Sequence, residues 1–320
     1  MEMRTLGRLW PVSALTLGGG GLGQVWGQTT REEAIETVRE AVDAGVTLLD
    51  VAPTYGDGEA ELVVGEAFGG RLPDSVRIVT KHRLGHPPTS EVLSRFEASL
   101  DASLRRMQLQ HVDLLILHGY LVSTATEGGD GRTPLSLYTS AVVPAFEQLV
   151  ERGRIGAWGI TGIAAPDAVL TALDHDPAPA AVQAITNPLD SPGAMRVDDS
   201  PPRPRLIIAR AVERGTGVMG IRAVQAGALT DRLDRELAVD DPTAADFERA
   251  APFRALARDL GESAASLAHR YALSMPGVDT VVLGVKNRVE LRECLAAEAR
   301  GPLDPDLIAR IDTVMRPVAS

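Results

Sequence analysis

The 320-residue sequence contains very little cysteine and very little lysine. Its single cysteine, Cys294, excludes an internal disulfide bond and is typical of a protein from a reducing cytosol. Of its 32 basic residues only two are lysines, Lys81 and Lys286. Since arginine serves wherever charge alone matters, we expect the two lysines at positions where the compact, tunable ammonium is needed.

The sequence also has no apolar run near the ~20 residues that a membrane-spanning helix needs. Its N-terminus, MEMRTLGRLW, lacks the apolar segment of a signal peptide, so we expect a cytoplasmic location. Basic residues form no cluster and the net charge is −11. This charge argues against a nucleic acid or an anionic membrane as a partner.

Linkers, repeats and low-complexity segments are absent as well, so we predict one domain over residues 1–320. Short apolar runs predict strands. Most of these runs lack the polar–apolar alternation of a strand with one solvent-exposed face, which indicates strands buried on both faces of a parallel sheet. There are eight such runs, at residues 14–18, 47–52, 76–81, 112–118, 155–160, 181–185, 216–221 and 280–284. Helical patterns occupy residues 31–45, 90–107, 143–153, 204–215, 263–274, 287–299 and 305–315.

This order of elements predicts an α/β fold, a (β/α)8 TIM barrel. We expect residues 4–15 to form a β-hairpin that caps the bottom of the barrel, and the last two helices to be C-terminal additions. Long loops follow the first, fourth, sixth and seventh strands. Loops of this kind lie at the C-terminal face, where barrel enzymes hold their sites.

Four polar residues fall at the ends of three adjacent predicted strands: Asp50, Tyr55, Lys81 and His118. Each alone has an ordinary structural explanation, as a helix cap, a packing residue or a hydrogen-bonded histidine. Together they would meet at one rim. An ammonium favours the phenolate, so we expect Lys81 to lower the pKa of Tyr55 from ~10. Asp50 would hold Lys81, and His118 would orient a substrate oxygen or assist proton transfer.

The sequence resembles the aldo-keto reductase superfamily over essentially its whole length. The matching segments are LLDVAPTYGDGEAELVVGEAF, VTKH, DLLILH, GAWGIT, VQAITNP, AGALT and VVLGVKNRVELREC, in that order. The resemblance implies a barrel, a nicotinamide dinucleotide cofactor and Tyr55 as the proton donor. Asp50, Lys81 and His118 complete the family's tetrad, and no metal is required.

Two segments depart from the family's pattern. The Ser-Asn pair that usually follows the fifth strand and binds the nicotinamide carboxamide is Thr161-Gly162 here, while Gln183 matches the family's carboxamide-binding glutamine. After the seventh strand, Ile221 and Arg222 replace a common stacking aromatic. Either Arg222 lies near the ring or reaches the pyrophosphate, or Ile221 packs on the ring and Arg222 is solvated.

The segment that begins at Gly284 matches the family's site for the adenosine 2′-phosphate and adenine. Lys286 and Arg288 favour NADP(H) over NAD(H) by pairing with phosphate, by about tenfold or more. Glu290 and Glu293 oppose this preference or bind adenine. The alternative is that all four are ordinary charges on the surface of a helix.

Gly20 and Gly21 lie in the run GGGGLG, which is not a Rossmann fingerprint because no doubly wound pattern accompanies it. We expect these glycines to let the backbone approach the nicotinamide side. Trp26 follows in a loop that either lines the substrate pocket or packs internally.

The function that these residues favour is NADP(H)-dependent reduction of an aldehyde or ketone to an alcohol, with a small-molecule carbonyl or alcohol as the partner. One alternative is an NAD(P)+-dependent sugar or alcohol dehydrogenase. A second is a Schiff-base aldolase with Lys81 as nucleophile, against which Tyr55, His118 and the cofactor segment argue. A third is a dinucleotide-sensing regulatory subunit without turnover.

Overall fold

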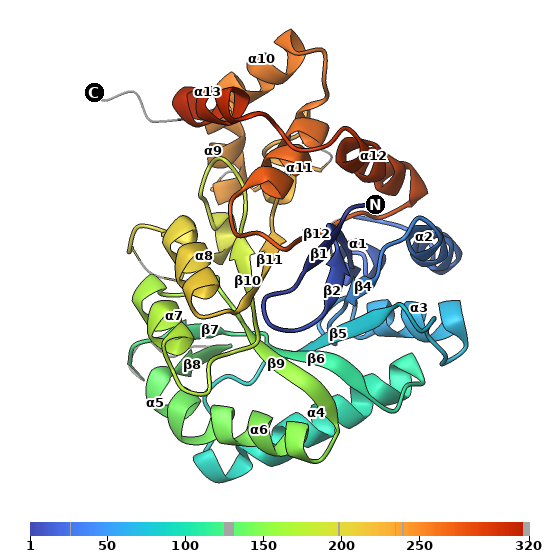
Figure 1. Cartoon of the computed structure of the whole chain (residues 1–320), viewed down its shortest axis with the longest axis vertical. Helices are drawn as coiled ribbons and strands as arrows, with labels where there is room; N and C mark the ends of the chain where they lie inside the picture. Colours follow the sequence, from blue (N-terminus) through green and yellow to red (C-terminus); the bar gives the residue numbers. More distant parts are fainter. Residues whose placement is uncertain (26, 125–130, 198, 234, 239, 316–320) are drawn as a thin grey trace.

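Eight parallel strands close into a barrel in the computed structural model, which describes residues 1–25, 27–124, 131–197, 199–233, 235–238 and 240–315 (Figure 1). The strands are β3 (Leu15–Gly18), β4 (Leu48–Asp50), β5 (Arg77–His82), β6 (Val112–Leu117), β9 (Ile155–Thr161), β10 (Ala181–Ile185), β11 (Gly217–Ile221) and β12 (Thr280–Leu283). β12 pairs with β3 and completes the ring. Each predicted apolar run overlaps one of these strands, which confirms the (β/α)8 fold.

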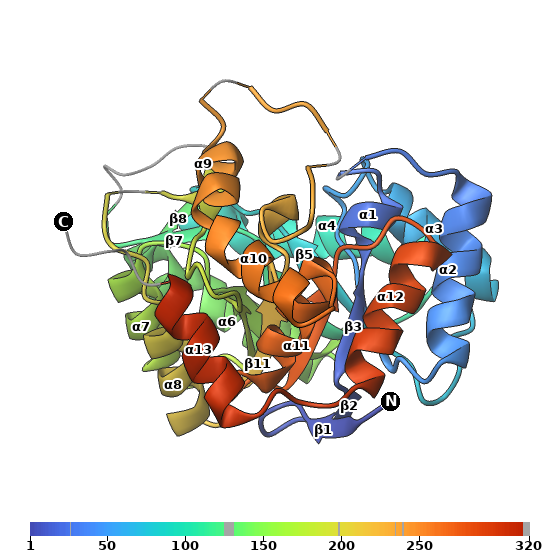
Figure 2. The same ribbon diagram turned by 90° about the horizontal axis from the view of Figure 1, so that it is seen from above.

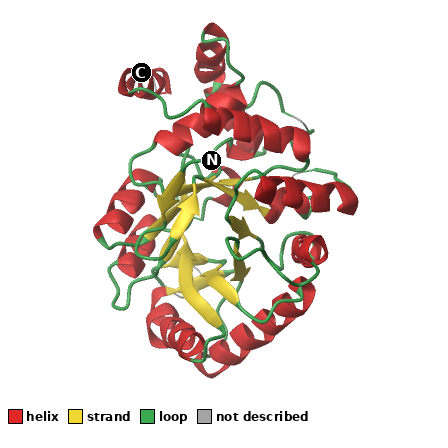
Figure 3. Cartoon of the chain, turned by 45° about the vertical axis from the view of Figure 1, so that its right-hand side comes forward, coloured by secondary structure: helices red, strands yellow, loops and turns green. Residues whose placement is uncertain are grey.

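Helices surround the strands on all sides (Figure 3). They are α2 (Arg31–Asp43), α3 (Glu59–Phe68), α4 (Val92–Met107), α6 (Val143–Glu151), α7 (Pro166–Leu173), α8 (Pro204–Glu213), α10 (Ala251–Asp259), α11 (Ala264–Ser274), α12 (Arg288–Ala299) and α13 (Pro305–Met315). The predicted helical segments correspond to seven of them. The helical patterns did not include α3, α7 or α10.

Capping side chains explain where several helices begin. Thr30 precedes α2, and its hydroxyl oxygen accepts a hydrogen bond from the backbone N–H of Glu33 at 3.2 Å. Ser263 and Asn287 cap α11 and α12 in the same way. Each cap satisfies a backbone N–H that the first helical turn leaves without a partner. The sequence therefore sets these helix starts locally.

A β-hairpin closes the N-terminal end of the barrel, as predicted. It consists of β1 (Met3–Thr5) and β2 (Pro11–Ser13). Leu6 and Val12 are completely buried and join the side chains that fill the barrel interior. The N–H of Gly7 also donates to the Asp279 carboxylate at 3.0 Å. Figure 2 shows the hairpin at the opposite end of the molecule from the long loops.

The long loops at the C-terminal end carry structure of their own. After β6, the short strands β7 (Tyr120–Val122) and β8 (Arg132–Pro134) pair, and α5 (Leu135–Leu137) and a π-helical turn (Tyr138–Val142) lead into α6. After β11, the segment expected to be a loop contains α9 (Pro242–Arg249). Figure 2 shows α9 rising above the barrel at this end. In the described part of the chain, no helix has the length and apolar character to cross a membrane.

Candidate active site

A buried ion pair lies at the centre of the C-terminal rim. The Nζ atom of Lys81, at the end of β5, is 2.8 Å from Oδ1 of Asp50, at the end of β4. The Lys81 side chain is 0% exposed and that of Asp50 3% exposed. The ammonium also donates to the Val51 carbonyl oxygen at 3.1 Å. Because β4 and β5 are parallel neighbours, their ends bring the acid and the amine together as predicted.

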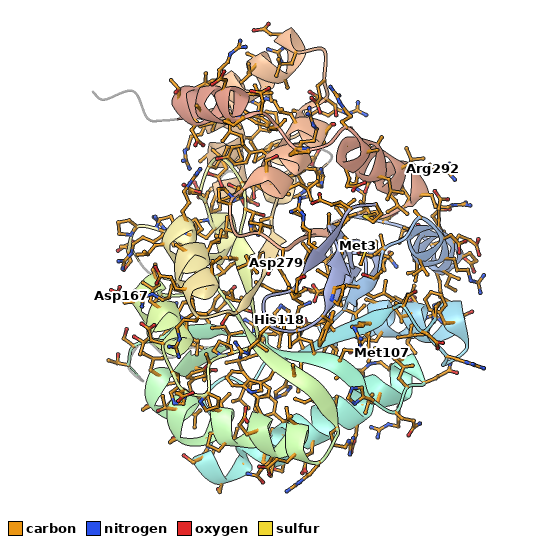
Figure 4. The ribbon with its side chains drawn as sticks, in the orientation of Figure 1. Met3, Met107, His118, Asp167, Asp279 and Arg292 are labelled. Atoms are coloured by element: carbon orange, nitrogen blue, oxygen red, sulfur yellow. The ribbon has the colours of Figure 1, made fainter. Side chains whose placement is uncertain are left out.

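Tyr55 and His118 lie against this pair. The Lys81 ammonium is 4.7 Å from the centroid of the Tyr55 ring. The His118 ring meets the Tyr55 ring edge-on, with 5.6 Å between centroids. Figure 4 labels His118 near the middle of the molecule, whereas Asp167 and Arg292 lie at its periphery. The structure therefore brings all four residues of the predicted tetrad into one group.

Burial dominates the proton affinities of this group. Burial raises the pKa of Tyr55, and the nearby Lys81 offsets only part of that rise, while Asp50 adds to it. Lys81 acts in the expected direction, but the expected net lowering of the Tyr55 pKa is wrong, because desolvation of the phenolate exceeds the attraction of Lys81. Burial favours the neutral form of Lys81, yet Asp50 and Tyr55 hold its pKa above the ordinary value.

His118 is a neutral imidazole at physiological pH. Burial, together with the positive charges of Lys81 and Arg83, lowers its pKa to about 3. Its Nδ1 atom is 3.4 Å from the Thr54 hydroxyl oxygen, a contact that nothing in the sequence indicated. His118 can therefore orient an oxygen by a hydrogen bond but carries no proton to give as an imidazolium.

Gln183 links the opposite side of the barrel to the ion pair. Its Nε2 donates to Oδ2 of Asp50 at 3.0 Å, so both carboxylate oxygens have partners. On the adjacent strand, Thr161 occupies the position in register with Gln183, and its hydroxyl donates to the Leu117 carbonyl oxygen. A Cβ at Gly162 would lie 2.7 Å from the Gln183 carbonyl oxygen. The backbone thus has no room for the family's asparagine at this position.

The glycines after β3 permit close backbone packing. Gly20 and Gly21 are buried in the short helix α1 (Gly19–Leu22). A Cβ on Gly21 would lie 2.0 Å from the Val285 carbonyl oxygen, and one on Gly18 would lie 2.2 Å from that of Leu283. These glycines bring α1 against the start of the loop after β12. Trp26, in the same long loop, lies outside the described residues.

Lys286 and Arg288 are each paired with a glutamate. Glu290 accepts from the Lys286 backbone N–H at 2.8 Å and lies 3.0 Å from its Nζ. Arg288 forms a two-pronged ion pair with Glu33 of α2, with contacts of 3.1 and 2.8 Å. Glu33 was not predicted as a site residue, because its nearness to Arg288 depends on how α2 packs beside α12.

Two further predicted cofactor residues have other contacts. Glu293 accepts from the Ser263 hydroxyl at 2.6 Å, which joins α12 to the start of α11. Gly284 lies at the exposed end of β12, two residues before Lys286. Arg222 directs its guanidinium toward Gln225 and Met195, which lie in the loops after β11 and β10.

This set of donors fits a nicotinamide dinucleotide. An amide and a hydroxyl, from Gln183 and Thr161, lie side by side on neighbouring strands next to the tetrad, as a carboxamide requires. Two cations, Lys286 and Arg288, flank the N-terminus of α12, a favourable place for a phosphate group. Groups suited to the two ends of such a cofactor therefore lie on the same face of the barrel.

The model of the Aldo/keto reductase family matches residues 14–316. The chain belongs to the aldo/keto reductase family. It is therefore an NAD(P)H-dependent oxidoreductase, and the superfamily resemblance seen in the sequence is confirmed. L-galactose dehydrogenase of Arabidopsis thaliana is 28% identical over 328 residues, which cover 99% of this chain and 95% of that relative.

Solved structures of other aldo-keto reductases have the same fold. The holo form of AKR11C1 from Bacillus halodurans is 22% identical, with a TM-score of 0.76 over 100% of this chain and 98% of that one. An aldo-keto reductase from Klebsiella pneumoniae in complex with NADPH is 23% identical, with a TM-score of 0.70 over 100% of this chain and 98% of that chain. At these identities the likeness concerns the fold.

The buried ion pair generates a prediction about Lys81. Lys81→Arg keeps the positive charge but forces a larger, planar group into a site with no exposed surface. We expect turnover to fall by at least ~10²-fold because Tyr55 loses its positioned neighbour. Steady-state kinetics measures the loss, and a thermal melt shows that the variant is folded. Wild-type rates would mean that Lys81 is only a structural cation.

Proposed function

We propose that the enzyme reduces an aldehyde or ketone to an alcohol with NADPH, and that Tyr55 is the proton donor. The observation that supports this most is the position of Tyr55 between the Lys81 ammonium and the His118 ring. A bound nicotinamide dinucleotide supplies the hydride. The chain's own residues supply a proton and hold the carbonyl oxygen that receives it.

In this proposal Tyr55 gives its hydroxyl proton to the oxygen as negative charge develops there. Lys81 stabilises the phenolate that remains, and Asp50 keeps the ammonium charged and in place. Neutral His118 donates a hydrogen bond to the same oxygen from its protonated ring nitrogen. The edge-on contact between the His118 and Tyr55 rings fixes how the two polar groups converge.

We propose that Gln183 and Thr161 bind the nicotinamide carboxamide and that the Gly20–Gly21 turn lies alongside it. Gln183 is held by Asp50, so the carboxamide site and the proton donor are fixed by one carboxylate. Lys286 and Arg288 would bind the 2′-phosphate, with Gly284, Glu290 and Glu293 nearby.

The reverse direction is the second candidate, because the same residues catalyse oxidation of an alcohol. One relative is called a dehydrogenase of L-galactose, and a structure of similar fold is a glycerol dehydrogenase from Gluconobacter oxydans. The paired state of Lys286 and Arg288 bears on this choice, since it weakens the preference for the phosphorylated cofactor. Another alternative from the sequence is a regulatory subunit without turnover. In such a protein the tetrad would have no chemical role, and the Tyr55→Phe variant described below tests this.

The first prediction concerns the proton donor. Tyr55→Phe removes only the hydroxyl, so reduction should fall by ~10²- to 10⁴-fold while cofactor binding survives. Tyr138→Phe is a matched control, because Tyr138 is completely buried and its hydroxyl has no partner among the described residues. We expect this control to keep wild-type turnover. Near-full turnover of Tyr55→Phe at saturating NADPH would contradict the assignment.

The second prediction concerns pH. Reduction needs Tyr55 protonated and His118 neutral. Burial raises the pKa of Tyr55 and lowers that of His118 to about 3. Neither group should titrate between about pH 5 and pH 9, so the single-turnover rate of NADPH oxidation should be flat there. A stopped-flow pH profile with an inflection near ~6.5 would show that His118 titrates as an ordinary imidazole.

The third prediction concerns cofactor preference. A 2′-phosphate must replace the glutamates that now pair with the two cations, so it gains only part of the ~1.5–3 kcal/mol of a charge-assisted hydrogen bond. We expect NADPH to bind about tenfold more tightly than NADH. Lys286→Ala should weaken NADPH binding alone, and Glu290→Gln should strengthen NADPH binding alone.

Fluorescence titration of both cofactors against the three proteins measures these affinities without turnover. Equal affinities for NADPH and NADH in the wild type would contradict the proposed preference. A Lys286→Ala variant that binds both cofactors more weakly by the same factor would place Lys286 away from the phosphate.

A further inference from the structure

Arg222 differs from the other cations at the C-terminal face in its partners. Its Nε donates to Oε1 of Gln225 at 2.8 Å, and its Nη1 donates to the Met195 sulfur at 3.2 Å. Both acceptors are neutral. No ion pair joins Arg222 to a carboxylate within the part of the chain that the structure describes. Lys286 and Arg288, by contrast, each contact a glutamate.

A buried network holds these two neutral acceptors in place. Asp246, 3% exposed, accepts from the Gln225 amide at 2.8 Å and from the Ser191 hydroxyl at 2.6 Å. The contact turns the Gln225 NH2 group toward Asp246 and its oxygen toward Arg222. Asn187 donates to the same Gln225 oxygen at 3.2 Å. The guanidinium is therefore held in one orientation by an amide oxygen and not by a charge.

The charge of Asp246 is balanced elsewhere. Its second oxygen forms an ion pair with Arg249 at 2.8 Å, on the outer side of α9. Arg222 consequently keeps a positive charge that no contacting carboxylate neutralises. Burial lowers the pKa of Arg222, the main effect on this group, yet the guanidinium stays protonated because its ordinary pKa is above ~12. Asp246 lies near enough to raise this pKa in turn, but it does not contact the guanidinium. A half-buried guanidinium whose described contacts include no carboxylate can form charge-assisted hydrogen bonds with an oxyanion.

The backbone at this position is also held in an uncommon conformation. Arg222 has φ of +61°, and Gln225 and Ala226 have φ of +47° and +51°. Left-handed residues other than glycine persist where the surroundings stabilise them, and they concentrate at functional sites.

The guanidinium leans toward the loops on the substrate side. Its Nη2 lies beside Gly193, since a Cβ there would be 2.8 Å away, and its Nη1 contacts Met195 in the same loop after β10. Beyond Gln225 in its own loop, its described side-chain contacts thus lie toward the loop after β10. The cations expected to bind the cofactor's phosphate lie on the other side, after β12.

We propose that Arg222 binds an oxyanion, a carboxylate or a phosphate, carried by the carbonyl substrate. Its planar fork presents two N–H groups at one edge, which match the two oxygens of such a group. The proposal rests on the reductase function and narrows its substrate class to anionic carbonyl compounds. It moves Arg222 from the predicted cofactor residues to the substrate residues.

The test compares 4-formylbenzoate with 4-formylbenzamide, which differ in charge but little in shape. The wild type should favour the carboxylate. Arg222→Gln should raise KM for 4-formylbenzoate by about tenfold or more. The same variant should leave both KM for 4-formylbenzamide and the dissociation constant of NADPH unchanged. Arg222→Lys should lie between, because it keeps a point charge without the fork. Arg152→Gln, on the exposed end of α6, controls for net charge.

Calorimetry gives a readout that does not need turnover. The product 4-(hydroxymethyl)benzoate should bind the NADP+-loaded wild type more tightly than its amide, and Arg222→Gln should abolish the difference. No discrimination by the wild type, or equal losses on both compounds, overturns the proposal. A raised NADPH dissociation constant in Arg222→Gln also overturns it, because Arg222 would then serve the pyrophosphate.

The two proposals fail in distinguishable ways. If neither aldehyde is reduced but the carboxylate product binds through Arg222, the oxyanion site stands and the reductase function fails. If both aldehydes are reduced with equal efficiency by the wild type and by Arg222→Gln, the reductase function stands and the oxyanion site fails.

Discussion

The buried ion pair between Lys81 and Asp50 is the interaction on which the site depends. Two charges without solvent are stable only when each is fully paired, and removal of one partner from such a pair costs about 3–5 kcal/mol. Here one oxygen of Asp50 forms the ion pair with Lys81, and the other accepts a hydrogen bond from Gln183. Gln183 comes from β10, across the barrel from β4. The hydrogen bonds of the site therefore depend on the closed barrel, which brings β4 and β10 within reach of each other.

The same burial sets the proton chemistry of the rim. It keeps Tyr55 protonated and His118 uncharged, and it leaves Lys81 as the one cation of the tetrad. A site with one protonated phenol and one neutral imidazole is suited to give a single proton to an oxygen. The positive charge of the tetrad therefore comes from the fixed Lys81 ammonium and not from a group that titrates near neutral pH.

Three of the cations at the C-terminal face differ in their partners. Lys286 and Arg288 are neutralised by Glu290 and Glu33, so an anion that binds there exchanges one partner for another. Arg222 is held by an amide oxygen and a sulfur, so an anion that binds there does not have to displace a contacting carboxylate. In a protein with a net charge of −11, this difference in pairing decides where a negatively charged ligand is most favoured.

The sequence by itself determined the eight strands, most of the helices and the four residues at the rim. Apolar runs and capping residues act locally, and parallel strands necessarily place their ends on one face. The helices α3 and α7 were not predicted. Their N-caps, Gly58 and Ala165, offer no capping side chain. Gly65 weakens the helical pattern of α3. A glycine is needed there because a Cβ would lie 2.5 Å from the Arg106 carbonyl oxygen of α4, and the sequence does not reveal this packing constraint.

Only the tertiary structure decided three features. They are the upward shift of the Tyr55 pKa, the pairing of Arg288 with Glu33, and the neutral acceptors that hold the Arg222 guanidinium. Each depends on groups far apart in the chain, whose distances follow from how helices and loops pack on the barrel. The net effect of burial and charge on a pKa is a difference between large opposing contributions, and a sequence supplies neither the burial nor the distances. Residue types can be read from the chain, but the balance between them is set by the fold.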